Sequence, residues 1–564
     1  MNVVQELSDR ALAWIDGDPD PQTRAELEAV VASGDEDELE SRMGSSLEFG
    51  TAGLRGAVGA GSARMNRAVV IRATAGLASY LQAQGRGDGP VVLGYDGRNS
   101  SRRFAEDAAG VLVAAGLQVQ YFEGTASTPL VAFAARILGS TAAVIVTASH
   151  NPAADNGYKV YDQNSAQIVP PVDGGIAAAI AAVGPANEVP RFEGALGDAL
   201  ERATPLDGIE EQYVAEMLAF RDPPPPGPSS PRIAYTALHG VGGPLMLRAL
   251  AAGGHESVVV VPEQFEPDGR FPTVEFPNPE EPGAMDMVES LATTEGADLV
   301  IANDPDADRL AVSVPLAGGW RRLTGNEIGV LLADFVLRRV GSGSGDLVIN
   351  SIVSSPMLGS IAAAHGARFE QTLTGFKWIA NAAMDLEHDG FRFLFGYEEA
   401  LGFSVGPAVR DKDGLSAGVW FADLVAAEAE HGRTVLDRLG DLWDEHGLWM
   451  SAQHSVTRVG SDGVKEIAAA MGRLRTALPE EVAGRPVIDV ADFAEGETGR
   501  PRWLPATNLV ILQLEGGSRV LARPSGTEPK LKFYADVRGT GDPDAVAAEA
   551  GVLARGLAEE LGLE

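Results

Sequence analysis

The stretch "AAVIVTASHNPAADNGYKVY", residues 142–161, joins an apolar run to a cluster of polar side chains. A short apolar run rich in Val and Ile is typical of a strand buried on both faces of a parallel sheet. Ligands of open α/β sheets bind beyond the carboxyl ends of the strands. Ser149 and His150 follow the run directly, so their position favours a functional role. A turn in which Ser, Asn and Pro serve only local hydrogen bonds is the alternative for this segment alone.

The same alternation of apolar runs and Ala-rich helical stretches starts near Gly89 and returns over 232–303 and 346–430. It predicts βαβ units that build mostly parallel sheets. A chain of 564 residues needs several domains, because single cores stop growing at about 250–300 residues. We expect boundaries near 205 and 450, with a smaller α+β domain after the second.

Composition limits the partners and the location. Acidic residues number 79 against 44 Lys and Arg, and the net charge is −35. Such a charge repels nucleic acids and anionic lipid surfaces, so neither partner is expected. The chain has no cysteine and no leader-like start, and no apolar run approaches the ~20 residues of a membrane span. These features predict a cytoplasmic globular protein. The Pro-rich "DPPPPGPSSP" at 222–231 is expected to be an exposed connection.

A serine hydrolase is one alternative for Ser149. The Gly-x-Ser-x-Gly turn that presents the nucleophile of α/β-hydrolases is missing around this residue. Adjacency of Ser149 and His150 in the chain does not by itself provide a Ser–His hydrogen bond. The motif therefore disfavours a hydrolase.

A second apolar strand, "DLVIANDPDADRLAV" at 298–312, ends in three alternating carboxylates, Asp304, Asp306 and Asp308. Carboxylates this close repel one another unless a cation neutralises them, and hard oxygen ligands suit Mg²⁺. A calcium EF-hand loop is excluded, because its sixth and twelfth positions require Gly and Glu, whereas this loop has Arg309 and Pro315. A solvated acidic turn is the alternative to a magnesium site.

A local basic segment, "RVLARPSGTEPKLKF" at 519–533, stands out in this acidic chain. Its Arg and Lys side chains surround Ser525, Gly526 and Thr527, a combination that suits phosphate binding. An ordinary strand-turn-strand with solvent-facing basic residues is the alternative.

Two further segments, "TGFKWI" at 374–379 and "GYEEALG" at 396–402, are weak signals separately. Together with the others they complete a set: an activatable hydroxyl, a metal site, a phosphate cradle and a carboxylate, Glu398, that can bind hydroxyl groups. This set predicts a phosphoryl-transfer enzyme that acts on a polyol phosphate.

The ordered motifs "TASHNP", "DPDADR", "GYEEALG" and "RPSGTEP" resemble those of the α-D-phosphohexomutase family, also called the phosphoglucomutase/phosphomannomutase family. The resemblance extends from "FGTAGLRG" at 49 to "ARPSGTEPKLKFY" at 522. It implies an α/β protein with three related α/β domains of mixed sheets and a C-terminal α+β domain around a central cleft. The expected domains are 1–204, 205–323, 324–450 and 451–564.

The resemblance also implies roles for individual residues. Ser149 is expected to carry the phosphoryl group and, through an oxygen of that phosphoserine, to bind magnesium together with Asp304, Asp306 and Asp308. Arg55, His150 and Lys159 match positions near general acid/base work. The expected substrate-binding residues are Arg309, Thr374, Gly375, Lys377, Glu398, Lys412, Arg523, Ser525, Gly526 and Thr527.

Within that set, Arg309 is expected to support the transferring phosphate and Glu398 to bind sugar hydroxyls. The 523–527 segment is expected to hold the phosphate that does not react. Lys412, in "RDKDG" at 410–414, is expected to reach substrate, with a salt bridge inside its loop as the alternative.

The predicted reaction interconverts hexose 1-phosphate and 6-phosphate, with glucose as the leading substrate and glucose 1,6-bisphosphate as activator. Phosphomannomutase and phosphopentomutase are alternatives, because Ala400 stands where many glucose and mannose enzymes have Ser and Tyr397 where they have Gly. These departures look most like the subgroup that includes phosphopentomutase-like and bisphosphate-synthesising members. A metal-dependent phosphohydrolase and a non-catalytic sugar-phosphate binding protein are alternatives from other classes. The expected oligomeric state is a monomer or a dimer.

Overall fold

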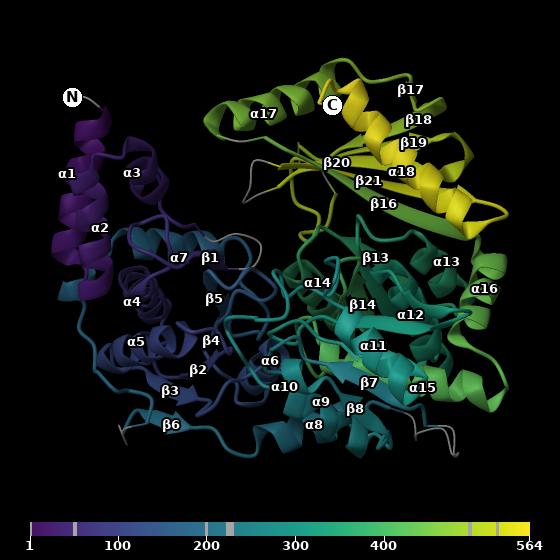
Figure 1. Ribbon diagram of the computed structural model, residues 1–564, viewed down its shortest axis with the longest axis horizontal. Coiled ribbons are helices and arrows are strands. Elements are labelled where there is room, and N and C mark those ends of the chain that lie inside the picture. Colours follow the sequence, from purple (N-terminus) through teal and green to yellow (C-terminus); the bar gives the residue numbers. More distant parts are fainter. Residues whose placement is uncertain are drawn as a thin grey trace. The chain divides into compact units, whose positions relative to one another are not determined.

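The computed structural model describes residues 3–48, 53–197, 201–221, 230–458, 460–494, 499–525 and 530–563 (Figure 1). The chain divides into two compact units. The first unit is 1–323 with 402–426, and the second unit is 324–401 with 427–564. Within the described residues, no helix has the length and apolar character that a bilayer crossing needs.

The first sheet contains the strand that opens the polar cluster. Its order is β1-β5-β4-β2-β3-β6, with β2, β3, β4 and β6 parallel and with β5 antiparallel to both β4 and β1. Every residue of β4 is buried, as expected for a strand covered on both faces. Helices α4 and α5 cover the face of Val91 and Val144, and α6 packs on β2 and β4. The strands are β1 Leu54–Ala57, β2 Pro90–Tyr95, β3 Gln118–Tyr121, β4 Ala142–Val146, β5 Asp155–Tyr161 and β6 Ala203–Pro205. The helices are α4 Arg67–Ala83, α5 Ser101–Ala114, α6 Thr128–Ile137, α7 Val172–Ala181 and the 3₁₀ turn η1 Ala186–Glu188.

Three helices precede this sheet: α1 Val3–Gly17, α2 Pro21–Ser33 and α3 Glu36–Met43. Asp20 and Asp35 cap the second and third helices by accepting backbone N–H bonds, which satisfies donors that a helix start leaves free. The helices share an apolar cluster that includes Leu7, Leu27 and Ala60. The loop after β1 is therefore packed against these helices.

The second sheet has the order β11-β10-β9-β7-β8. β7 is parallel to β8 and β9, whereas β10 and β11 continue as an antiparallel hairpin. The strands are β7 Ile233–Thr236, β8 Val258–Val260, β9 Leu299–Ala302, β10 Ala311–Leu316 and β11 Gly319–Arg322. The helices of this part are α8 Ile209–Ala219, α9 Gly243–Ala252, α10 Pro262–Phe265 and α11 Asp286–Glu295. The segment 402–426 adds β15 Gly402–Val405 and most of α15 Gly414–Glu430 to the first unit.

The second unit starts with another α/β part. β12 Asp346–Ser351 pairs in parallel with both β13 Arg368–Thr372 and β14 Arg392–Glu398. Thr324 and Glu327 form a reciprocal capping box at the start of the first helix. The helices are α12 Gly325–Val340, α13 Met357–Ala364, α14 Phe376–His388 and α16 Val435–His446.

The last sheet is antiparallel, in the order β16-β21-β20-β19-β18-β17. Helix α18 packs on β16 and β21, and α17 contacts β21 (Figure 1). The strands are β16 Leu448–Thr457, β17 Glu481–Val482, β18 Arg485–Asp492, β19 Val510–Leu514, β20 Arg519–Pro524 and β21 Lys530–Gly539. The helices are α17 Gly460–Thr476, α18 Pro543–Glu560 and the 3₁₀ turn η2 Glu515–Gly517.

These sheets confirm the predicted architecture of three α/β parts with mixed sheets followed by an α+β part. The sequence pattern over 346–430 indicates neither β13, which lies between α13 and α14, nor the turn at 399–401 that separates β14 from β15. The boundaries of the four expected domains stay predictions. The Pro-rich connection lies mostly outside the described residues, which lack 222–229.

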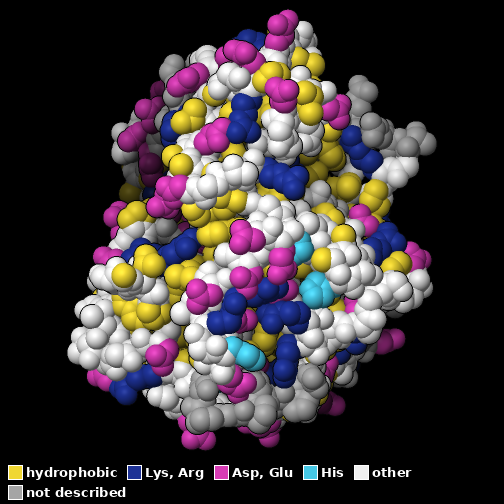
Figure 2. All heavy atoms as spheres, turned by 90° about the vertical axis from the view of Figure 1, so that its right-hand side faces the viewer, with side chains coloured by type: hydrophobic (Ala, Val, Ile, Leu, Met, Phe, Trp, Pro, Cys, Tyr) yellow, Lys and Arg dark blue, Asp and Glu magenta, His cyan; other side chains and the backbone are white. Residues whose placement is uncertain are grey.

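Charged side chains of both signs are mixed on one face of the molecule. On the face shown in Figure 2, Lys and Arg side chains lie beside Asp and Glu side chains. Pairs such as Arg322 with Asp286 and Glu289 illustrate the same mixing within the first unit. The expected absence of nucleic-acid partners stays a prediction.

Candidate active site

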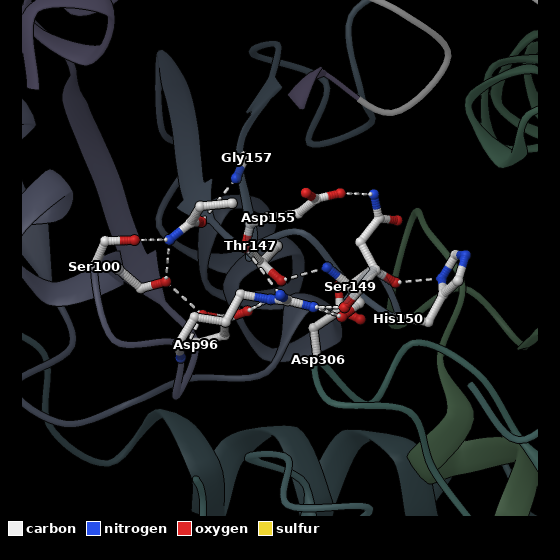
Figure 3. Close-up of polar contacts among 12 residues, drawn as sticks. Asp96, Ser100, Thr147, Ser149, His150, Asp155, Gly157 and Asp306 are labelled. Carbon is white, nitrogen blue, oxygen red and sulfur yellow. Dashed lines mark hydrogen bonds and ion pairs between the residues drawn. The ribbon is translucent and has the colours of Figure 1, made fainter. Parts of the chain in front are cut away.

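Ser149 lies three residues beyond the carboxyl end of β4, almost fully buried. Its φ of 51° places it in the left-handed region, which is uncommon for a residue other than glycine and marks a constrained backbone. The Ser149 N–H donates to Thr147 Oγ1 at 2.9 Å (Figure 3). Ser149 Oγ donates to Asp304 Oδ2 at 2.8 Å. The turn therefore aims the hydroxyl at the loop that follows β9.

Asp304, Asp306 and Asp308 form the acidic group predicted from the sequence. All three are buried, and one oxygen from each lies within 4.8 Å of the others. Thr128, the first residue of α6, donates its N–H to the carbonyl of Asp306 at 2.9 Å and its hydroxyl to Asp306 Oδ2 at 2.6 Å. The metal loop and the first sheet are thereby joined inside the first unit.

Two lysines neutralise part of this acidic group. Lys159 Nζ, buried on β5, lies 2.8 Å from Asp306 Oδ2 and 3.1 Å from Asp308 Oδ2. Lys412 Nζ lies 2.8 Å from Asp308 Oδ2 and 3.7 Å from Asp411 Oδ1. The salt bridge that was the alternative for Lys412 is thus present, and its contact with substrate stays a prediction.

The pKa values of the acidic group reflect this pairing. Burial, reinforced by the charges of Asp306 and Asp308, raises the pKa of Asp304 well above its usual range. Burial also acts to raise the pKa of Asp306, but Lys159 and hydrogen bonds outweigh it and hold that pKa well below its usual range. Burial acts to lower the pKa of Lys159, yet Asp306 and Asp308 raise it overall, so the ammonium stays charged.

The donor set fits a divalent cation. Among the described residues, the buried Oδ1 atoms of Asp306 and Asp308 have no hydrogen-bond partner, although their Oδ2 atoms are bonded. Buried carboxylate oxygens without a partner are costly unless a cation binds them. A cation at Asp304 would also reverse the repulsion that raises its pKa. Oxygen-only ligands of this kind suit Mg²⁺.

His150 contacts Ser149 through Nδ1, which lies 3.1 Å from Ser149 Oγ. Adjacency in the chain alone did not predict this hydrogen bond. On its other side, Nε2 lies 3.3 Å from Arg309 Nη2. A guanidinium only donates, so Nε2 accepts and the ring hydrogen belongs on Nδ1, facing Ser149 Oγ. Burial, with Arg309 and Arg55 nearby, holds the pKa of His150 well below its usual range, so the ring is neutral.

Arg309 and Arg55 complete the first-unit set. Arg309 Nη1 lies 3.0 Å from Glu280 Oε2, and Arg55 Nη1 donates to Asn151 Oδ1 at 3.1 Å. Burial lowers the pKa of Arg55, with Asp306 and Asp308 acting in the opposite direction. Nine predicted residues thus gather in the first unit: Arg55, Ser149, His150, Lys159, Asp304, Asp306, Asp308, Arg309 and Lys412.

The turn after β7 supports the metal loop. Val241 N–H donates to the carbonyl of Pro305 at 2.9 Å. A Cβ on Gly240 would overlap the backbone of Pro305, so only glycine permits this approach. The Asn303 side chain accepts from Tyr235 Oη at 3.0 Å and donates to the carbonyl of Arg309 at 2.7 Å. Both ends of the loop are therefore fixed.

The remaining predicted residues belong to the second unit. Glu398, at the end of β14, accepts the N–H of Gly375 at 2.6 Å, just before α14 and Lys377. Among the described residues, the buried Thr374 Oγ1 has no hydrogen-bond partner. The Gly375 N–H therefore ties the loop at 374–377 to Glu398.

The basic segment is only partly described. Ser525 N–H donates to the carbonyl of Lys530 at 2.7 Å, which closes the β20–β21 pairing on both sides of the loop. Gly526 and Thr527 lie outside the described residues. Burial and Glu399 raise the pKa of Tyr534, whereas Arg523 lowers it, so Arg523 lies beside these groups.

Tyr397 does not belong to the ligand-facing set. Its ring is fully buried and covers the position of a Cβ on Gly329 of α12, and its hydroxyl donates to Asn326 Oδ1 at 3.3 Å. The difference from glycine at this position therefore changes the packing of β14 on α12. It gives no direct information about the sugar.

Two residues of this region were missed from the sequence. Thr128 begins a helix, and Arg98 follows β2 in "GYDGR". Arg98 stands beyond the carboxyl end of a parallel strand, the same position that drew attention to Ser149. The rule that ligands bind beyond the carboxyl ends of parallel strands could therefore have identified Arg98 from the sequence. Nothing in the local sequence of Thr128 indicates its contact with Asp306.

Comparisons with known proteins agree with this architecture. Models of the α/β/α domains I, II and III of phosphoglucomutase/phosphomannomutase match residues 46–186, 211–318 and 324–446. A "Probable phosphomannomutase" of Haemophilus influenzae is 41% identical over 495 residues, covering 86% of this chain and 96% of that protein. The phosphoribomutase of Saccharomyces cerevisiae is 35% identical over 576 residues, covering 94% of this chain and 93% of that protein.

A solved structure shows the same fold. The open form of pp63/parafusin, a phosphoglucomutase from Paramecium, superposes with a TM-score of 0.70 at 17% identity, covering 92% of this chain and 96% of that one. The matched domains and the two relatives cover most of the chain. The chain therefore belongs to the phosphoglucomutase/phosphomannomutase family, also called the α-D-phosphohexomutase family, whose members are intramolecular phosphotransferases.

Proposed function

We propose that this protein is a magnesium-dependent phospho-sugar mutase in which Ser149 carries the phosphoryl group. The observation that carries the proposal is the 2.8 Å hydrogen bond from Ser149 Oγ to Asp304 Oδ2, at the edge of a buried carboxylate group. A hydroxyl beside a cation site is the arrangement that phosphoryl transfer through an enzyme-bound phosphate needs.

The first transfer moves PO₃ from phosphorylated Ser149 to the 6-hydroxyl of a hexose 1-phosphate. The bond from Ser149 Oγ to phosphorus breaks as the sugar oxygen bonds to phosphorus. The sugar hydroxyl loses one proton and Ser149 Oγ gains one, so the step balances. His150 Nδ1–H faces Oγ at 3.1 Å and stabilises the leaving oxygen.

The second transfer regenerates the enzyme. The hexose 1,6-bisphosphate turns around, and Ser149 Oγ bonds to the phosphorus on sugar O1 as the bond from that phosphorus to O1 breaks. The hydroxyl hydrogen of Ser149 passes to O1. The product is hexose 6-phosphate. In the unphosphorylated state Asp304 Oδ2 accepts the Ser149 hydroxyl, which keeps Oγ pointed at the acidic group.

Charge around the transferring group comes from several side chains. Magnesium, when bound, supplies positive charge to the oxygens of the PO₃ group. Asp304, Asp306, Asp308 and an oxygen on Ser149 would hold it. Arg309, beside His150, adds a guanidinium to the same region. The near-complete burial of Ser149 limits the access of water that would hydrolyse a phosphoserine.

Substrate binding is proposed to rely on the second unit. Glu398 would bind sugar hydroxyls, with Thr374, Gly375 and Lys377 beside it, and Arg523 with Ser525, Gly526 and Thr527 would hold the phosphate that does not react. The tie between Glu398 and Gly375 N–H supports a preformed group. Because the sugar binds in two orientations, the distal phosphate serves as the common anchor.

Glucose is the leading hexose, with mannose as the alternative. A pentose substrate, converted between its 1- and 5-phosphates, is a second candidate. It is supported by the phosphoribomutase relative, which matches this chain over most of its length. Glucose 1,6-bisphosphate is the proposed activator, because it can phosphorylate Ser149 directly.

The experiment that tests the proposal compares 1-phosphates of glucose, mannose, ribose and deoxyribose, each with and without glucose 1,6-bisphosphate. Turnover to the 6- or 5-phosphate that depends on Mg²⁺ and is raised by the bisphosphate supports a mutase and ranks the sugars. Steady release of inorganic phosphate as the main product would instead support a phosphohydrolase. Binding without turnover of any sugar would support a binding protein.

A further inference from the structure

We propose that Arg98 is a positioning residue that holds the Ser149 loop in its reactive conformation. The inference rests on the proposed role of Ser149 as the phosphoryl carrier. Arg98 follows β2 and is 4% exposed. Among the described residues, its side-chain hydrogen bonds all go to backbone carbonyl oxygens, and none goes to a carboxylate of the metal loop. Its action on the reaction is therefore through the backbone of another segment.

The guanidinium of Arg98 gathers four carbonyl oxygens of one loop. Nη2 donates to the carbonyls of Ser149 at 2.7 Å and Asn151 at 2.5 Å. Nη1 donates to the carbonyls of Pro152 at 2.7 Å and Asp155 at 2.9 Å. Four carbonyl dipoles that point at one centre repel one another unless a cation with several donors lies between them. Arg98 supplies that cation.

The carbonyl of Ser149 is the link to the reaction. Ser149 has a left-handed backbone, which is strained for a residue other than glycine and persists only where surrounding contacts hold it. The bond from Arg98 Nη2 is one such contact, and the bond from Ser149 N–H to Thr147 Oγ1 is another. If the first is lost, the turn can relax and Oγ moves away from Asp304.

Other residues orient the guanidinium. Asp96 Oδ2 lies 3.3 Å from Arg98 Nε, while Asp96 Oδ1 accepts from the N–H of Arg98 at 3.0 Å and from Ser101 Oγ at 2.5 Å. Figure 3 shows Asp96 between Ser100 and Ser149. Asn156 Nδ2 donates to Ser100 Oγ at 2.7 Å and to Ser101 Oγ at 3.0 Å. The Asp96 carboxylate therefore pairs with the same guanidinium that binds the carbonyls of the Ser149 loop.

A loop from the second sheet region covers the arginine. Arg98 Cζ lies 5.0 Å from the centroid of the Phe271 ring, a cation–π distance. A Cβ on Gly269 would lie 2.7 Å from Arg98 Cα, and a Cβ on Gly97 would lie 2.8 Å from Pro267 Cβ. The two loops are in close contact, so Phe271 excludes water from a site whose hydrogen bonds water would otherwise weaken.

The test uses Arg98→Lys, which keeps the charge and removes the fork that reaches four carbonyls. We expect kcat to fall about 100-fold, the loss that a displacement of about 1 Å can cause, while KM for the sugar phosphate stays within about twofold. Hydrogen exchange of the peptide 147–157 should become faster. Phosphorylation of Ser149 by glucose 1,6-bisphosphate, followed by mass spectrometry, should slow in proportion to kcat.

Arg72→Lys is the matched control. Arg72 also donates to a backbone carbonyl, that of Val183 at 3.1 Å, and lies 5.8 Å from the Trp14 ring. This variant should lower thermal stability but leave kcat and exchange of 147–157 unchanged below its unfolding temperature. Unchanged kcat and exchange in folded Arg98→Lys would overturn the inference.

A second variant covers the case in which Arg98→Lys does not fold. Phe271→Leu keeps every hydrogen bond of Arg98 and removes the ring above it. We expect a fall of about tenfold in kcat and faster exchange of 147–157. Wild-type values for both would overturn the inference. Absence of phosphate on Ser149 of the wild-type protein after incubation with glucose 1,6-bisphosphate and Mg²⁺ would instead refute the proposed function, which separates the two failures.

Discussion

Lys159 Nζ lies 2.8 Å from Asp306 Oδ2, in a fully buried contact that also includes Asp308 at 3.1 Å. An ammonium buried between two carboxylates does two things. It lowers the repulsion within the acidic group, and it occupies only the Oδ2 atoms. The Oδ1 atoms are thereby left to face a metal ion.

Replacing this lysine by methionine should destabilise the metal-free protein. Lys159→Met leaves buried carboxylates without their cation, a loss of about 3–5 kcal/mol for a broken buried pair. Mg²⁺ should restore part of the loss by supplying another cation. Thermal melts in EDTA and in Mg²⁺ measure both effects. Lys465→Met, at an exposed site on α17, is the control, and an equal melting temperature for both variants in EDTA would contradict the prediction.

Ser149→Ala should abolish turnover while sugar phosphate binding is retained. The variant removes only Oγ, the atom that bonds Asp304 and His150. Intact-mass spectrometry should find one phosphate on the wild type and none on the variant, and calorimetry should show binding within about twofold of wild type. Ser140→Ala changes another buried serine of the same sheet region, whose Oγ has no partner among the described residues. It should keep full activity. Phosphate on Ser149→Ala would refute the assignment.

Thr128→Val should weaken magnesium binding although Thr128 is not a proposed ligand. Its hydroxyl holds Asp306 Oδ2 at 2.6 Å, and loss of such a supporting bond costs about 10–100-fold in metal affinity. Titration of Mg²⁺ by calorimetry measures the change in Kd directly. Thr141→Val, whose hydroxyl donates to the carbonyl of Arg86 instead, should leave the Kd unchanged. A wild-type Kd for Thr128→Val would show that Asp306 needs no such support.

Stability should fall below neutral pH in part through His239. Burial lowers the pKa of this ring, and its Nε2 lies 2.8 Å from Thr273 Oγ1. The unfolded chain, with a histidine pKa of about 6.5, binds a proton more readily than the folded chain. The stabilising contribution is therefore full above about pH 6.5 and is lost as pH falls towards the folded pKa.

This contribution of His239 can be measured as the difference in melting temperature between two pH values. The melting temperature of the wild type should drop between pH 7.5 and 5.5 by more than that of His239→Asn, since Asn tolerates the left-handed φ of 59° and does not titrate. An equal drop in melting temperature for the two proteins would show that His239 does not contribute to the pH dependence of stability.

The sequence was most informative where a buried strand ends in polar residues. Ser149 and the Asp304, Asp306 and Asp308 group follow β4 and β9, and the structure brings them together in the first unit. The carboxyl-end rule predicts such sites because parallel strands bring their ends to one edge. The apolar runs of these strands were equally clear, since every residue in each is buried.

Other parts could not be predicted because their signals are not local. β13 is half-buried, so its residues Arg368–Thr372 lack the apolar pattern of a central strand. Asp308 forms ion pairs with Lys159 and Lys412, which are each about 100 or more positions away in the sequence. Only the tertiary fold brings these three residues together. The Tyr at position 397, where many relatives have Gly, could not be interpreted from the sequence. Its ring packs against Gly329 of α12, and this contact depends on the tertiary fold.

The three N-terminal helices have a practical consequence for anyone who trims this chain. The domain I family match begins at residue 46, yet Leu7, Leu27 and Met43 share a cluster with Ala60, and Ser62 Oγ donates to the carbonyl of Ser45 at 2.7 Å. A fragment that begins at residue 46 would expose apolar side chains, such as Ala60, that the N-terminal helices cover. These side chains follow β1, the strand that contains Arg55. We expect such a fragment to aggregate during expression. A fragment for crystallisation or ligand screening should therefore include α1, α2 and α3.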